Sequence, residues 1–197
     1  MKLLLNTAAI IATALPALAD VIPDPLPNGF VEQGRFTGAI NGTDVTLITT
    51  GRAEDNISGL CLYRHGDHEQ SEMFEIGAGS DFHHPPAEIP WSIEMTLQTD
   101  AATEELQLVI VKAFDGDYFT PLMANTEDGY MKTGQITLQN IDTAKGGYIS
   151  FDFSADLVRR EISAGIDPAP IKGDPGGHIE GHYEGTVPDR ATETYQN

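Results

Sequence analysis

The sequence predicts an all-β fold, an antiparallel β-sandwich or barrel of roughly 7–10 short strands with little or no helix. Two observations carry this prediction. Apolar and polar residues alternate with a period of two in several segments, most clearly over residues 91–99. The chain also contains 20 Gly and 12 Pro, and no segment combines helix caps with a 3.6-residue apolar period. A closed barrel and an open sandwich fit this pattern equally.

The first 19 residues have the order of a secretory signal peptide. Lys2 gives a basic start, an apolar stretch follows, and Ala17 and Ala19 form a small-residue cleavage site after Pro16. The apolar stretch is shorter than the roughly 20 residues of a membrane span, and no basic stop-transfer residues follow it. We therefore expect cleavage after residue 19 and a soluble protein without a membrane anchor, in a bacterial periplasm or secreted.

Residues 30–187 are expected to form a single β domain, between a Pro-rich lead-in over 20–29 and a mobile tail over 188–197. The strands expected along the chain cover residues 30–40, 45–50, 57–63, 91–99, 106–111, 136–138, 148–157 and 179–187. Asn41-Gly42 is typical of the turn that joins a two-residue hairpin. A short helical turn is expected at 158–164, and the Gly- and Pro-rich segment 165–177 is expected to be a loop.

The charge of the chain excludes some partners. The net charge is −19, and it becomes −20 when the signal peptide takes Lys2 away and no acid. Such a chain lacks the cations that bind nucleic acid or an anionic membrane surface. The single cysteine, Cys61, rules out an intrachain disulfide and a multi-cysteine metal site. Its neighbours Leu60 and Leu62 suggest a buried thiol, and pairing with another chain is the alternative.

Histidines are the residues with an unusual distribution, since four of the six fall within twenty positions: His65, His68, His83 and His84. Neutral imidazole is a common ligand of transition metals, so this clustering predicts a possible copper or zinc site. A second, weaker set consists of His178, Glu180 and His182. On a strand the two histidines share a face but stand roughly 13 Å apart at ~3.3 Å per residue, too far to hold one ion together. Glu180 can join either of them.

The motifs of hydrolases are missing from the sequence. No Gly-x-Ser-x-Gly occurs, and residues 77–81 are only glycine-rich. Ser80 and Asp81 lie near His83 and His84 in sequence, which is weak evidence because triads assemble across a fold. Asp115-Gly116-Asp117 lacks the spacing of a calcium loop and is interpreted as an acidic turn.

We therefore predict an exported, acidic β domain that acts by binding or interaction, with no catalytic residue assigned and an enzyme disfavoured. The ligand is unknown, and a protein partner is possible, with Tyr118 and Phe119 as a candidate apolar contact. Two alternatives stay open. The first is a periplasmic copper- or zinc-binding protein that uses the clustered histidines, and the second is a hydrolase.

Overall fold

The computed structural model describes residues 22, 25–52, 54, 57–65, 72–81, 89–100, 103, 105–126, 133–144, 147–163, 166–187 and 192–195. These residues contain the short 3₁₀ turn η1 (Pro27–Gly29) and no α-helix. No helix in this described part of the chain is long and apolar enough to cross a membrane. The strands are β1 (Val31–Ile40), β2 (Thr43–Arg52), β3 (Ile57–Ser58), β4 (Leu60–His65), β5 (Glu72–Gly79), β6 (Ser92–Thr99), β7 (Leu106–Phe114), β8 (Leu122–Asn125), β9 (Gln135–Ala144), β10 (Tyr148–Ser163), β11 (Ile166–Pro170), β12 (Gly177–Thr186) and β13 (Thr192–Tyr195).

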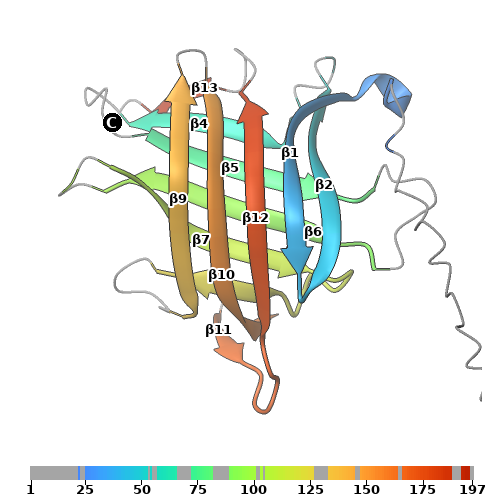
Figure 1. Ribbon diagram of the computed structural model, residues 1–197, viewed down its shortest axis with the longest axis vertical. Helices are drawn as coiled ribbons and strands as arrows, with labels where there is room; N and C mark the ends of the chain where they lie inside the picture. The colour runs from blue at the N-terminus through green and yellow to red at the C-terminus, as the bar shows by residue number, and fades with distance from the viewer. Residues whose placement is uncertain are drawn as a thin grey trace, which may run out of the picture.

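The strands form one large, almost wholly antiparallel sheet that folds into two layers, so the all-β prediction is confirmed. Strands β9, β10, β12, β1 and β2 make the layer at the front of Figure 1, and β4 to β7 cross behind it at a steep angle. Hydrogen-bonded neighbours follow the order β5-β6-β7-β8-β10-β12-β1-β2. A bridge from Ile48 of β2 to Gly79 of β5 then joins the two ends of this series, so the arrangement is barrel-like.

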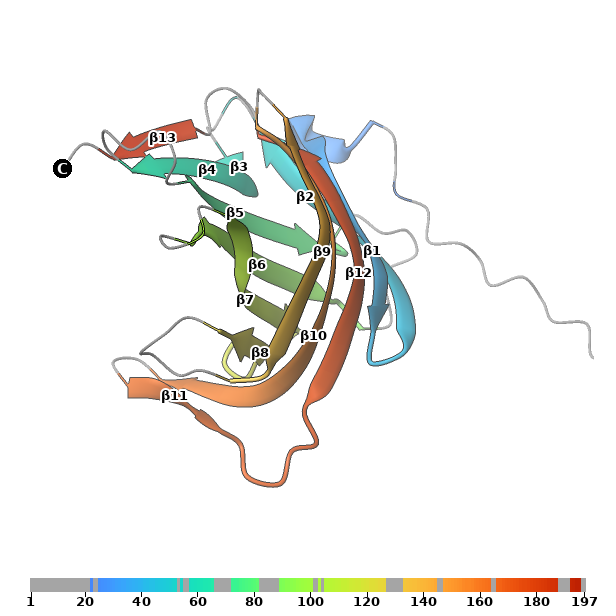
Figure 2. The ribbon, with the colours of Figure 1, turned by 60° about the vertical axis from the view of Figure 1, so that its left-hand side comes forward.

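The long strand β10 holds the two layers together. Its first part pairs with β9 and β12 in the front layer, whereas Val158 and Arg159 pair with β8 of the second layer. The side view in Figure 2 shows β10 curving from one layer toward the other. The helical turn expected at 158–164 is therefore wrong over 158–163, because tertiary pairing with β8 outweighs a weak local preference.

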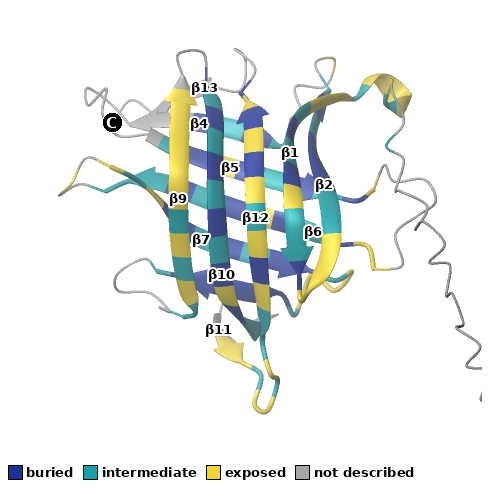
Figure 3. Cartoon of the chain, in the orientation of Figure 1, coloured by how far each residue is buried: buried dark blue, intermediate teal, exposed yellow. Residues whose placement is uncertain are grey.

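The core lies between the layers and follows the alternation seen in the sequence. Phe151 faces Tyr183 and Ala155 faces Ile179 across β10 and β12, and all four side chains are buried. Figure 3 shows buried residues alternating with mostly exposed ones along β12 and with mostly intermediate ones along β10. One face of the front layer is thus packed and the other is open to solvent.

Glycines on the inner face of β1 and β12 make room for two large aromatic rings. A Cβ at Gly34 would overlap Tyr183 Oη, and one at Gly181 would lie 2.7 Å from Phe36 Cε2. The Tyr183 hydroxyl lies 3.0 Å from Thr49 Oγ1 in the core. Burial raises the pKa of Tyr183 well above its usual range, so the phenol stays neutral and keeps this hydrogen bond.

Three segments differ from the expectations of the sequence. The segment 165–177 is not wholly a loop, since β11 pairs with the end of β10. Within the expected tail, β13 lies parallel to β4. Cys61 is half-buried rather than buried, because it stands on the outer side of β4 while Leu60 and Leu62 point into the core.

Candidate functional site

The histidines predicted as a metal site are only partly within the described residues. His65 ends β4, and nothing is described of its side chain, while His68, His83 and His84 lie outside the described residues. The four-histidine site stays a prediction.

The second predicted set lies on the outer face of β12, where each histidine pairs with an aspartate of β10. His178 Nδ1 lies 2.8 Å from Asp156 Oδ1, and His182 Nδ1 lies 2.7 Å from Asp152 Oδ1. Glu180 is close only to His178, at 3.9 Å between Nε2 and Oε2. Among the described residues, no group of three or more His, Cys, Asp or Glu side chains is placed to hold a metal ion.

His182 also contacts a serine that sequence reasoning did not single out. Its Nε2 lies 3.4 Å from Ser150 Oγ, while Nδ1 faces Asp152. Asn140 donates to the other oxygen of Asp152 at 2.7 Å. The hydrogen bonds from Asn140 and His182 hold the pKa of Asp152 below its ordinary value, so this carboxylate is ionised near neutral pH.

The structure also contains a groove that the sequence did not predict, on the outer surface where β2 meets β5. Its volume is about 260 Å³. Gly59, Gly77 and Gly79 leave its floor without side chains, and the backbone closes the seam below, since Gly59 donates to Thr50 O and Gly77 donates to Gly59 O. A groove forms here because glycine replaces every side chain that would fill the outer face of β5 near its end. The lining consists of Ile48, Thr50, Gly59, Gly77, Ala78, Gly79, Asp81, Ser92, Ile93, Glu94 and Tyr118.

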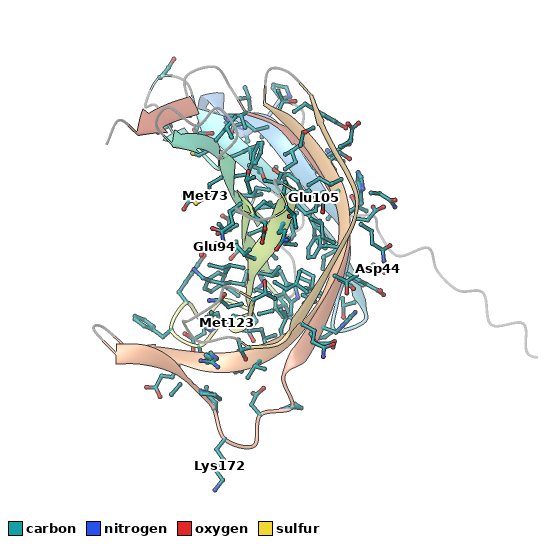
Figure 4. The ribbon with its side chains drawn as sticks, turned by 90° about the vertical axis from the view of Figure 1, so that its left-hand side faces the viewer. Asp44, Met73, Glu94, Glu105, Met123 and Lys172 are labelled. Atoms are coloured by element: carbon teal, nitrogen blue, oxygen red, sulfur yellow. The ribbon has the colours of Figure 1, made fainter. Side chains whose placement is uncertain are left out.

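Carboxylates and one aromatic ring border this groove. Asp81 is exposed at the end of β5, and Glu94 stands on the outer face of β6, where Lys112 Nζ approaches its Oε2 at 2.8 Å. Figure 4 shows Glu94 on the side of the β5–β6 layer that points away from the β10–β12 layer. Tyr118 is 63% exposed, so most of its ring is free to contact a ligand.

The loop that carries Tyr118 is held by its own hydrogen bonds. Asp117 accepts from the Phe119 N–H at 2.8 Å and from the Thr120 hydroxyl at 2.9 Å, and these bonds lower the pKa of Asp117. Arg159 of β10 donates to Thr120 O at 2.8 Å and to Asp115 at 2.9 Å. Residues 115–117 therefore form the acidic turn predicted from the sequence, and they fix the position of the ring beside the groove.

The sequence contained weak signs of this site. The glycine-rich stretch 77–81 does not match a nucleophile motif, but its glycines form the floor of the groove. Ser80, which lies beside Asp81 in this stretch, is 6% exposed, whereas Asp81 is open to solvent. Tyr118 and Phe119 were correctly placed in an exposed loop. The sequence did not indicate that β2 pairs with β5, and this pairing brings the segments that line the groove together.

Comparison with known proteins gives no further information on function. No protein-family model, curated protein or solved structure matches the chain.

Proposed function

We propose that the protein is an exported binding protein that holds a small, positively charged organic ligand in the groove between β2 and β5. The observation that carries the proposal is the composition of the groove, in which two carboxylates and an exposed tyrosine ring surround a glycine floor. An amine or quaternary ammonium group is the ligand chemistry that suits both carboxylates and the face of an aromatic ring. The proposed location is the periplasm or the cell exterior, on the basis of residues 1–19.

The charges near the groove support a cationic ligand over an anionic or neutral one. Asp81 and Glu94 contribute two negative charges, and Lys112 offsets part of one of them through its contact with Glu94. The chain as a whole carries a net charge of −19, which raises the local concentration of cations around it. A neutral sugar would use the ring and the hydroxyls of Thr50 and Ser92, but it would gain nothing from this charge.

The lining of the groove favours binding over catalysis. Among the described residues that line it are Ser92 and two carboxylates, and these described residues include no histidine or cysteine to act as base or nucleophile. The glycine floor brings backbone rather than reactive side chains against the ligand. We therefore propose that the groove binds a ligand and does not catalyse a reaction.

Calorimetric titration with choline and with its neutral isostere 3,3-dimethylbutan-1-ol tests this proposal. We expect choline to bind with a Kd below about 1 mM, equivalent to about 4 kcal/mol, and the isostere to bind at least about tenfold more weakly. Glu94→Gln is expected to weaken choline binding at least about threefold. Glu184→Gln is the matched control, because Glu184 is an exposed carboxylate on β12 in the other layer. Equal affinity for choline and its isostere, or equal effects of the two substitutions, would contradict the proposal.

Binding of copper or zinc by His65, His68, His83 and His84 is the second candidate function. It is supported by the clustering of these residues in the sequence. Titration of chelator-treated protein with each metal tests it. A saturable site tighter than about 1 μM that is lost on replacement of His83 and His84 by Gln supports it, and the absence of such a site rejects it.

A further inference from the structure

The outer face of β10 and β12 holds three side chains connected in the order of a nucleophile, a base and a positioning group. Asp152 is ionised and only accepts, so its contact with His182 Nδ1 places the imidazole proton on that nitrogen. The other nitrogen, Nε2, is then left as an acceptor toward the hydroxyl of Ser150 at 3.4 Å. This is the connectivity by which a histidine activates a serine for attack on an acyl group.

The sheet itself fixes this arrangement. His182 and Asp152 are direct cross-strand partners, and Ser150 lies two residues from Asp152 on the same face of β10. Strands β9 and β12 flank β10 on both sides at this point, so none of the three groups depends on a loop for its position. Asn140 holds the second oxygen of Asp152 and keeps the carboxylate turned toward the imidazole.

The same face contains a matched pair without the serine. His178 and Asp156 are also direct cross-strand partners, with Nδ1 2.8 Å from the carboxylate. The Nε2 atom of His178 faces Glu180 at 3.9 Å instead of a hydroxyl. Ser154 lies between the two aspartates on β10 and pairs with Glu180 rather than with a histidine. The molecule thus contains internal controls for a histidine–aspartate pair and for a partly exposed serine.

We propose that Ser150 is an activated nucleophile that takes the acyl group of an ester. Ser150 Oγ attacks the carbonyl carbon while His182 Nε2 accepts the hydroxyl proton, and the imidazolium is stabilised by Asp152. The ester C–O bond then breaks, and the alcohol leaves with the proton returned from His182. The product is an acyl ester on Ser150, which water hydrolyses by the same proton transfers in reverse.

The surroundings of Ser150 define the class of ester. Glu184 and Asp142 are its cross-strand neighbours, so they repel anionic esters and favour neutral or cationic ones. The backbone of β10 is paired on both sides, so the oxyanion is left to solvent and good leaving groups are required. We expect acylation to be readily detected and deacylation to be slow.

Reaction of the purified protein with para-nitrophenyl acetate tests the proposal through two readouts, release of nitrophenolate and peptide mass mapping of the acetyl group. We expect an acetyl group on Ser150 and release of nitrophenolate that depends on Ser150 and His182. Ser150→Ala and His182→Gln should each lower the rate of this labelling at least about tenfold. Asp152→Asn should also lower the rate of labelling, because the wrong tautomer of His182 then faces Ser150.

Ser154→Ala and His178→Gln are the matched controls, and both should leave the labelling of Ser150 unchanged. All the substituted side chains are at least partly exposed, and circular dichroism verifies that each variant is folded. Acetylation of Ser154 to the same extent as Ser150 would overturn the proposal. So would acetylation of Ser150 that survives His182→Gln, or that falls equally with His178→Gln.

Discussion

At the scale of single residues, the buried hydroxyl of Tyr183 is held in the core by a hydrogen bond and by close packing. The ring is fully buried, and its hydroxyl lies 3.0 Å from Thr49 Oγ1. A buried hydroxyl that loses its partner costs about 1–3 kcal/mol, whereas removal of both polar groups is nearly neutral. Small residues at Gly34 and Gly185 leave the space in which this hydroxyl sits.

Thr49→Val is therefore expected to lower the free energy of unfolding by about 1–3 kcal/mol. The double variant Thr49→Val with Tyr183→Phe is expected to recover most of that loss, because no polar group is then left unpaired. Denaturant unfolding of the two single variants and the double variant measures this cycle. Simple addition of the two single effects would contradict a direct hydrogen bond between these side chains.

Much of the candidate site was beyond prediction at this scale. Ser150 and Asp152 stand on the polar side of a strand that the sequence predicted, and His182 belongs to the weak set that it named. Nothing local indicates that β12 pairs with β10 in the register that places His182 opposite Asp152. Register between strands far apart in sequence depends on the whole sheet, so the contact with Ser150 became visible only in three dimensions.

At the scale of elements, the sequence identified the strands with clear alternation and the long apolar run of β7, but it did not identify β5 or β8. The period of two located β6, most of β10 and β12, and the Asn41-Gly42 turn correctly located the β1–β2 hairpin. The strand β5 was missed because Gly77 and Gly79 replace polar residues at the end of its outer face, and β8 was missed because its four residues are all buried and show no alternation. The same glycines that remove the alternation of β5 leave the space that forms the groove.

The loop between β7 and β8 depends on ionised Asp117 for its shape. Its hydrogen bonds from Phe119 and Thr120 depress the pKa of the folded state, so the stabilisation is present above the unfolded pKa. This stabilisation is lost as pH falls below about 4. Asp117→Asn removes the charge, and the variant is expected to lose less stability than the wild type between pH 5 and pH 2.

Denaturant unfolding across this pH range measures the difference. Asp44→Asn serves as the control, because Asp44 is an exposed carboxylate on β2, outside the loop between β7 and β8. If the free energy of unfolding fell by the same amount for the wild type and for Asp117→Asn between pH 5 and pH 2, these hydrogen bonds would not depend on the charge of Asp117.

At the scale of the whole molecule, charge and topology act together on the proposed ligand. The net charge of −19 attracts cations at long range, and closure of the sheet between β2 and β5 provides the place where one is held. Added salt screens the long-range attraction of cations more than the short-range contacts in the groove. The affinity for a cation should therefore fall moderately with ionic strength and not vanish. The net charge can be counted from the sequence, and the fold class was predicted from it. The pairing of β2 with β5, which creates the groove, was not predicted.

Gly77→Val offers the most direct test of the groove as a binding site, because it fills the floor while leaving the charges in place. A Cβ at Gly77 meets only Gly59 O within 4 Å, at 3.8 Å, and valine is favourable in a strand, so the variant should fold. Calorimetric titration of wild type and Gly77→Val with choline is the measurement. The account predicts binding to the wild type and at least about a tenfold loss in the variant, with an unchanged unfolding midpoint. Equal choline affinity in a folded Gly77→Val variant would contradict it.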